Sequence, residues 1–163
     1  MTTYDKGKYH DDTVAELGLP EAHADHHTAF FLRWLVERSL LSATFEDECA
    51  ELLGAHRADA ASARDVYAWC DRTLADDMLS DEGNAFARDY FDFDRGAYLA
   101  DYARVLQRDL PSQYHVPFTD ENYRALRDVI DTRHAEWRAR PPAPPAAPAS
   151  AGGVWARVRG LFG

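Results

Sequence analysis

The sequence predicts an all-α fold, a compact single-domain bundle of about five to six helices followed by a disordered Pro/Ala-rich C-terminal tail. Three observations support this prediction. The chain has 163 residues, close to the size of one domain. It contains 8 Phe, 8 Tyr and 4 Trp residues, enough to build a core. Apolar residues recur at helical spacing, and no alternation is long enough to build a sheet.

Helix starts and stops place the elements in order. Residues 1–19 are polar and irregular, and a helix is expected from Pro20, since proline is tolerated in a first turn. The buried stripe of this helix is expected to be Phe30, Phe31, Trp34 and Leu35. Further helices are expected near Ser42 or Thr44, from Ser62, from Ala85, from Asp94 and from Thr119, where capping residues precede apolar stripes. Pro111 and Pro117 interrupt helix, so a short hairpin or extended pair near residues 112–118 stays open.

Composition divides the chain into three parts. Residues 1–138 form an acidic helical domain, 139–153 a Pro/Ala linker, and 154–163 a short basic amphipathic tail. The whole chain has a net charge of -10, and because residues from 139 onward hold three arginines and no acid, residues 1–138 carry -13. Such a body repels phosphate backbones, which argues against nucleic acid and favours a basic protein partner, a cation or simply a solvated surface.

The two cysteines and the N-terminus indicate a cytoplasmic protein. Cys49 and Cys70 belong to no C-x-x-C pair and fall in helical apolar patterns, as expected of core thiols in a reducing compartment. A disulfide between the two is the alternative. The N-terminus is too polar for a signal peptide, and no apolar run reaches transmembrane length. We therefore expect no stable membrane insertion.

Several unusual strings occur in one order along the body. They are Tyr4-Asp-Lys-Gly-Lys-Tyr-His10, His27-Thr-Ala-Phe-Phe-Leu-Arg-Trp-Leu35, Asp76-Asp-Met-Leu-Ser-Asp-Glu-Gly-Asn-Ala-Phe-Ala87, Tyr90-Phe-Asp-Phe93 and Leu110-Pro-Ser-Gln-Tyr-His-Val116. Through these strings the chain resembles a bacterial family of small acidic helical proteins of unknown function, over roughly residues 4–138. The resemblance implies a single compact helical domain. It implies no activity, cofactor or catalytic residue.

His23, His26 and His27 form the first candidate site. On a helix, His23 and His27 are four residues apart and share a face, and His26 lies on the same broad side. Imidazoles so spaced can share Zn²⁺ or Ni²⁺ with a carboxylate from elsewhere. The competing interpretation is a polar first turn that leads into the core stripe.

The acidic connection before the residue-85 helix is the second candidate. Asp76, Asp77, Asp81 and Glu82, with Asn84, could bind a cation or accept arginines from a partner. The competing interpretation is that these acids only cap the adjacent helical turns. The string Asp92–Gly96 lacks the calcium-loop pattern, so we interpret it as a helix boundary.

Catalytic motifs are missing from the sequence. It holds no G-x-S-x-G, no Walker A loop and no G-x-G-x-x-G. The nearest catalytic set would require His10, His115 and the 76–82 carboxylates to meet in a cleft. We therefore expect no catalytic residues and no cofactor apart from the metal alternative.

The basic tail supports three interpretations. Trp155, Arg157, Arg159, Leu161 and Phe162 could dock in a partner's groove, contact a membrane surface weakly, or do nothing. Taken together, the leading hypothesis is a non-enzymatic protein-binding domain for a basic protein, in the manner of immunity or antitoxin proteins. The alternatives are a metal-dependent enzyme or metal-binding protein that uses the histidines, and a peripheral membrane adaptor that uses the tail.

Overall fold

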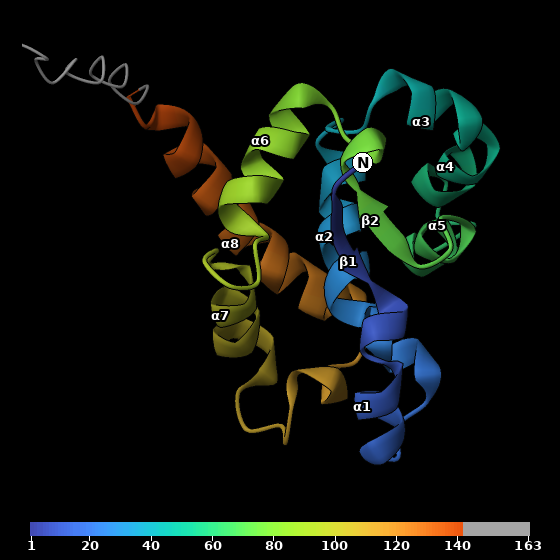
Figure 1. The fold of residues 1–163 in the computed structure, drawn as a ribbon, viewed down its shortest axis with the longest axis vertical. Helices are drawn as coiled ribbons and strands as arrows, with labels where there is room; N and C mark the ends of the chain where they lie inside the picture. Colours follow the sequence, from blue (N-terminus) through green and yellow to red (C-terminus); the bar gives the residue numbers. More distant parts are fainter. Residues whose placement is uncertain (142–163) are drawn as a thin grey trace, which may run out of the picture.

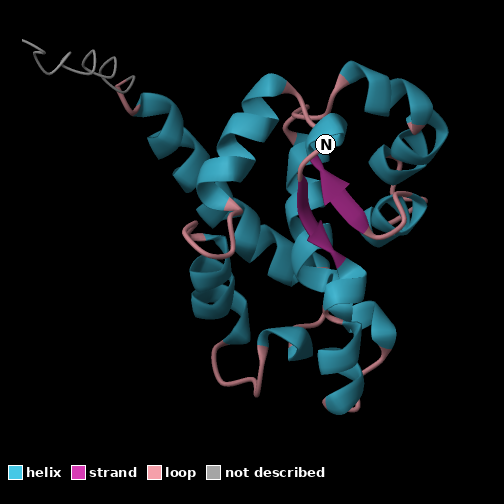
Figure 2. Ribbon diagram, in the orientation of Figure 1, coloured by secondary structure: helices cyan, strands magenta, loops and turns pink. Residues whose placement is uncertain are grey.

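The computed structural model describes residues 1–141, and this part of the chain is mostly helical (Figures 1 and 2), which confirms the all-α prediction. Its α-helices are α1 (Asp11–Glu16), α2 (His26–Glu37), α3 (Ala43–Glu48), α4 (Ala50–Arg57), α5 (Ala63–Trp69), α6 (Asp81–Tyr90), α7 (Tyr98–Tyr102) and α8 (Asp120–Ala139). The helix expected from residue 42 is split at Cys49 into α3 and α4, and α1 occupies a segment that was expected to be irregular. The linker beyond residue 141 and the basic tail lie outside the described residues.

Shorter elements join the helices. Short stretches of 3₁₀ helix are η1 (Gly7–Tyr9), η2 (Glu21–Asp25), η3 (Asp76–Met78) and η5 (Gln113–His115), and η4 (Ala103–Gln107) is a π-helical turn that extends α7. Strand β1 (Thr3–Lys6) pairs antiparallel with β2 (Thr73–Ala75), with an irregular register between Thr3 and Asp5. The extended pair considered near 112–118 is therefore wrong, because η5 occupies that segment. Strands of three and four residues are too short to show alternation.

Helix α2 is the centre of the core. Ten of its 12 residues are buried, including the whole expected stripe. It contacts α5 and α8, and Figure 1 shows α3–α5 on one side of α2 and α6–α8 on the other. On the α6–α8 side, the Phe31 ring stacks on Phe91 with centroids 4.5 Å apart and lies 5.4 Å from Tyr98. Aromatic residues of this size each remove about 150–250 Å² from water, which explains why α2 holds both halves together.

Side-chain caps begin four of the helices. Ser42, Ser62 and Thr119 accept hydrogen bonds from backbone N–H groups three residues on, as their positions predict, and Ser80 does the same for α6. The expected cap at Asp94 is wrong. Asp92 instead accepts hydrogen bonds from the backbone N–H groups of Asp94 and Arg95 in a local turn, and α7 begins after Ala97 without a side-chain cap.

Candidate functional site

The three histidines of the predicted metal site lie at the junction of η2 and α2 and point in two directions. The rings of His23 and His26 lie 4.5 Å apart between centroids. Nδ1 of His23 lies 2.6 Å from the carbonyl oxygen of Tyr114, and Nδ1 of His26 lies 2.9 Å from that of Val116. His27 turns away from both, because residues three apart line up along the 3₁₀ turn η2 and the next residue points elsewhere.

His26 is buried in its neutral form. Burial lowers the pKa of His26 to about 4, although its hydrogen bond to the Val116 carbonyl favours the protonated ring. In the neutral ring Nδ1 donates to that carbonyl, which leaves Nε2 buried without a hydrogen-bond partner among the described residues. His23 and His26 thus hold the 114–116 backbone against α2.

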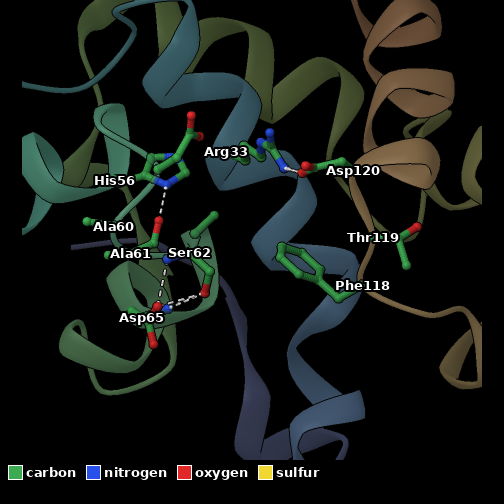
Figure 3. A pocket seen from close by; sticks show the side chains of 11 residues that line it. Arg33, His56, Ala60, Ala61, Ser62, Asp65, Phe118, Thr119 and Asp120 are labelled. Atoms are coloured by element: carbon green, nitrogen blue, oxygen red, sulfur yellow. Dashed lines mark hydrogen bonds and ion pairs between the residues drawn. The ribbon is translucent and has the colours of Figure 1, made fainter.

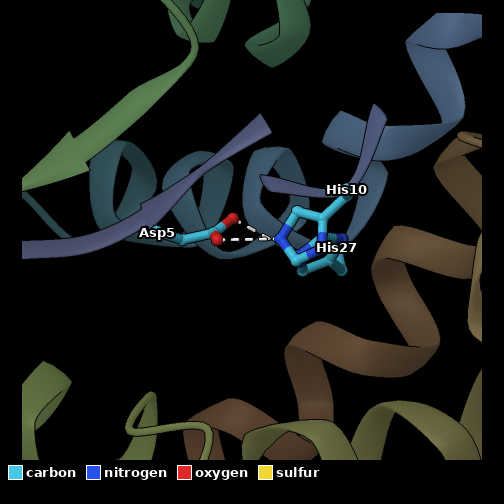
Figure 4. Close-up of side chains that lie close together, drawn as sticks. All are labelled: Asp5, His10 and His27. Carbon is cyan, nitrogen blue, oxygen red and sulfur yellow. Dashed lines mark hydrogen bonds and ion pairs between the residues drawn. The ribbon is translucent and has the colours of Figure 1, made fainter. Parts of the chain in front are cut away.

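His27 instead belongs to a buried polar cluster with Asp5 and His10 (Figure 4), which we name the Asp5 centre. The Asp5 carboxylate lies 2.8 Å from Nε2 of His10 and 3.3 Å from Nε2 of His27. It also accepts a 2.5 Å hydrogen bond from the Thr28 hydroxyl. Nδ1 of His10 lies 2.9 Å from the Tyr114 hydroxyl. Strand β1, the start of α1, the first turn of α2 and η5 therefore converge on one carboxylate.

The Asp5 carboxylate is ionised despite being only 2% exposed. Burial alone would raise the pKa of Asp5, but its contacts with His10, His27 and Thr28 outweigh burial and hold the pKa well below its usual range. A neutral His10 satisfies the chain of hydrogen bonds when Nε2–H donates to Asp5 and Nδ1 accepts from the Tyr114 hydroxyl.

Arg72 fixes the backbone beside the centre. Its guanidinium contacts Asp11 at 2.6 Å, Glu21 at 2.8 Å and Asp25 at 2.8 Å, and its carbonyl accepts a hydrogen bond from the Gly7 N–H. Hydrogen bonds with Asp11 and Asp25 raise the pKa of Arg72. A Cβ at Gly7 would overlap the Asp25 carboxylate and the Arg72 guanidinium, so a larger residue at this position would displace the Arg72–Asp25 ion pair.

Sequence patterns did not connect Asp5 with His10 and His27. The strings that carry the family resemblance nevertheless supply every residue of the centre, since Asp5 and His10 come from the first, His27 and Thr28 from the second and Tyr114 from the last. His115 does not join them and lies 2.9 Å from the Ser112 hydroxyl through Nδ1.

The acidic connection is partly structural. Glu82 lies 3.0 Å from Nε2 of His134. Asn84 accepts a hydrogen bond from the Tyr4 hydroxyl and donates to the backbone carbonyls of Asp76 and Leu79. Asp77 and Asp81 are exposed, and Asp76 is half-buried. The structure thus brings these residues together around the β2–η3–α6 turn, with two carboxylates pointing to solvent.

Two surface cavities lie among the described residues at some distance from the Asp5 centre. The larger, of about 580 Å³, lies between the α4–α5 loop, α2 and the start of α8 (Figure 3). Two of its polar side chains already have partners, because Arg33 pairs with Asp120 at 2.6 Å and Nδ1 of His56 lies 3.0 Å from the Ala61 carbonyl. The smaller, of about 480 Å³, is lined by Glu82, Trp137, Arg138, Arg140 and Pro141. No residue of the Asp5 centre lines either cavity.

One large aromatic side chain, that of Trp69, is exposed where the end of α5 meets α3. Trp69 at the end of α5 is 51% exposed, and its ring meets the edge of Phe45 of α3 at 5.9 Å. Glu48 lies one helical turn after Phe45, and the Asp77 carbonyl accepts a hydrogen bond from Ser42, which caps α3.

Both cysteines are free thiols, Cys49 buried and Cys70 half-buried. Burial raises the pKa of Cys49 and raises that of Cys70 to about 12, so neither is an activated thiolate. Among residues 1–141, no helix combines the length and apolar character needed to cross a membrane. The predicted docking residues of the tail, from Trp155 to Phe162, lie outside the described residues.

Comparison with known proteins agrees with the resemblance seen in the sequence. A family model described as Domain of unknown function (DUF7832) matches residues 3–116, well over half of the 163-residue chain. The match contains the whole Asp5 centre and ends before α8. Searches of curated proteins and of solved structures found no match. The chain therefore belongs to the DUF7832 family, a family of domains of unknown function.

Proposed function

We propose that the chain is a non-enzymatic protein-binding domain that recognises a basic protein through a surface centred on Trp69. We define the Trp69 surface as Trp69 with the exposed carboxylates of Glu48, Asp71 and Asp77. The observation that carries the proposal is an exposed tryptophan that packs on α3, while α3, the residues after α5 and η3 carry exposed carboxylates that form no ion pair with another described residue. Tryptophan is enriched among residues that dominate binding energy, because it offers a large rigid apolar area.

Charge defines the partner. The net charge of -13 on residues 1–138 attracts a basic surface and accelerates association with it. Immunity and antitoxin proteins that cover a basic enzyme bind partners of this class, and by analogy we extend the proposal to such a role for this chain. Asp76 and Asp81 extend the acidic area from η3 to the start of α6.

The test is a capture experiment with matched variants. Full-length protein is immobilised and exposed to an extract of its source organism at low and at high salt. Trp69→Ala should weaken binding of the dominant partner by about 2 kcal/mol or more. Tyr9→Ala is the control, because Tyr9 is 64% exposed and lies outside the Trp69 surface.

Charge reversal provides the second arm. Asp77→Lys should slow association, and wild-type binding should weaken as salt rises because surface charges are screened. A partner that binds equally well to Trp69→Ala and Tyr9→Ala, or no dominant partner at low salt, contradicts the proposal. The membrane and docking interpretations of residues 154–163 remain predictions, and liposome flotation with and without that segment separates them.

A further inference from the structure

The Asp5 centre offers a set of metal ligands that the sequence spacing did not suggest. Asp5, His10 and His27 each present one ligand atom, and the three atoms lie within 4.8 Å of one another. Ligands of Zn²⁺ and similar ions lie about 2.0–2.2 Å from the metal. Three atoms this close can therefore reach one ion with small side-chain movements.

An unpartnered buried nitrogen points into this cluster. His27 is 1% exposed, and its Nε2 has no hydrogen-bond partner among the described residues. It lies 3.3 Å from the Asp5 carboxylate, but the geometry is not that of a hydrogen bond. A buried polar atom without a partner is costly, and coordination to a cation would satisfy this nitrogen. Nε2 of His26 is also unpartnered, but no carboxylate among the described residues forms an ion pair with it, and Nδ1 of His26 is hydrogen-bonded to the Val116 carbonyl.

Outer contacts hold two of the ligands in place. Thr28 donates to Asp5, and the Tyr114 hydroxyl contacts Nδ1 of His10. With Nε2 of His10 on a metal, the proton moves to Nδ1, which then donates to the Tyr114 oxygen. Hydrogen bonds of this kind orient histidine ligands in metal sites and raise their basicity.

We propose that Asp5, His10 and His27 bind one divalent first-row transition-metal ion, with Zn²⁺ as the probe. Two imidazoles and one carboxylate match the ligand preference of such ions, whereas Ca²⁺ and Mg²⁺ prefer oxygen ligands. Asp5 and His27 are 2% and 1% exposed, which favours a small ion over an organic substrate. The ion would join β1, the start of α1 and the first turn of α2, so binding should stabilise the fold.

Binding to wild-type protein is the first measurement. Full-length protein without a histidine tag is treated with a chelator, dialysed against Zn²⁺ and analysed for metal content and thermal stability. The expected result is one equivalent of Zn²⁺ per chain and a melting temperature that rises with Zn²⁺ concentration. The Co²⁺-loaded protein should show visible absorption bands that Zn²⁺ abolishes. Absence of stoichiometric binding overturns the proposal without any variant.

Variants then locate the site. His10→Ala and Asp5→Asn should weaken Zn²⁺ binding by more than about 100-fold, and Tyr114→Phe by about tenfold. His10→Ala is the decisive variant, because the His10 side chain is 15% exposed and its loss leaves a smaller hole than loss of His27. Circular dichroism confirms that each variant is folded before it is scored.

Two histidines outside the centre serve as controls. His23→Gln and His134→Ala should bind Zn²⁺ as tightly as wild type. If His23→Gln loses the ion while folded His10→Ala keeps it, the site is the His23/His26/His27 set predicted from spacing, and the present proposal is wrong. Because the Trp69 surface shares no residue with the Asp5 centre, the metal result and the partner result can fail independently.

Discussion

Replacing Asp101 by alanine should destabilise the protein more than the loss of any exposed ion pair would. Asp101 on α7 is 3% exposed, and its carboxylate accepts hydrogen bonds from Arg133 of α8 at 2.8 and 3.1 Å. Arg104 at 3.1 Å and the Tyr90 hydroxyl of α6 at 3.2 Å also donate to it. One carboxylate thus connects α6, α7 and α8.

The loss of stability depends on whether each hydrogen-bond donor finds another acceptor once the carboxylate is removed. Arg133 and Arg104 have side chains 42% and 62% exposed, so water can replace their hydrogen bonds at little cost. Tyr90 is 3% exposed, and its hydroxyl would remain buried without an acceptor, which costs about 1–3 kcal/mol. We expect Asp101→Ala to lower the free energy of unfolding by about 2–3 kcal/mol.

Urea unfolding followed by circular dichroism at pH 7 measures this loss, and a double variant tests its cause. Tyr90→Phe removes the hydroxyl, so Asp101→Ala/Tyr90→Phe should be about 1 kcal/mol more stable than Asp101→Ala. Arg104→Ala should cost about 0.5 kcal/mol or less. A loss below about 0.5 kcal/mol for Asp101→Ala, or a double variant less stable than Asp101→Ala, refutes the reasoning.

The same contact has a defined pH dependence. Burial alone would raise the pKa of Asp101, but hydrogen bonds with Arg133 and Arg104 outweigh it and hold the pKa below its usual value of about 3.9. The stability that ionised Asp101 contributes is complete above the unfolded pKa and is lost as pH falls through the lower folded pKa. The difference between wild type and Asp101→Ala should stay constant from about pH 5 to 8 and shrink below about pH 4.

Three further stability predictions follow, each measured by urea or thermal unfolding. Gly54→Ala should stabilise the protein by about 0.5–1 kcal/mol, because Gly54 lies in α4 with open space where a Cβ would be. Gly83→Ala should destabilise the protein, because a Cβ at this position of α6 would overlap the Leu40 carbonyl. Equal changes in stability at the two glycines would contradict this explanation. Ser62→Ala should cost about 1 kcal/mol through loss of the capping box, and an unchanged midpoint would count against it. Phe31→Ala should cost about 3–5 kcal/mol, since five aromatic rings surround Phe31, and a loss under about 1 kcal/mol would contradict its central place.

Helix positions and the core face of α2 followed from the sequence. The stripe of Phe30, Phe31, Trp34 and Leu35 is fully buried as expected, and caps at Ser62 and Thr119 begin their helices. These features depend on residues close together in the chain, so spacing and capping chemistry are enough to predict them.

Local rules were less successful where the backbone changes its helical period. The spacing of His23 and His27 predicts a shared face only if the segment is α-helical throughout. The segment up to Asp25 is instead a 3₁₀ turn, which aligns His23 with His26 and frees His27 to face another element. The sequence identified a histidine-rich segment but grouped His27 with His23 and His26, whereas His27 lies with Asp5 and His10.

By itself the sequence determined an acidic helical body, the core face of α2, most of its caps and the family strings. Only the tertiary structure decided that Asp5, His10 and His27 meet. Their meeting requires β1 to pair with β2, about seventy residues further along the chain, and requires the first turn of α2 to lie against β1. Side chains distant in sequence come together through packing and long-range strand pairing, and the periodicity within one segment cannot predict such contacts.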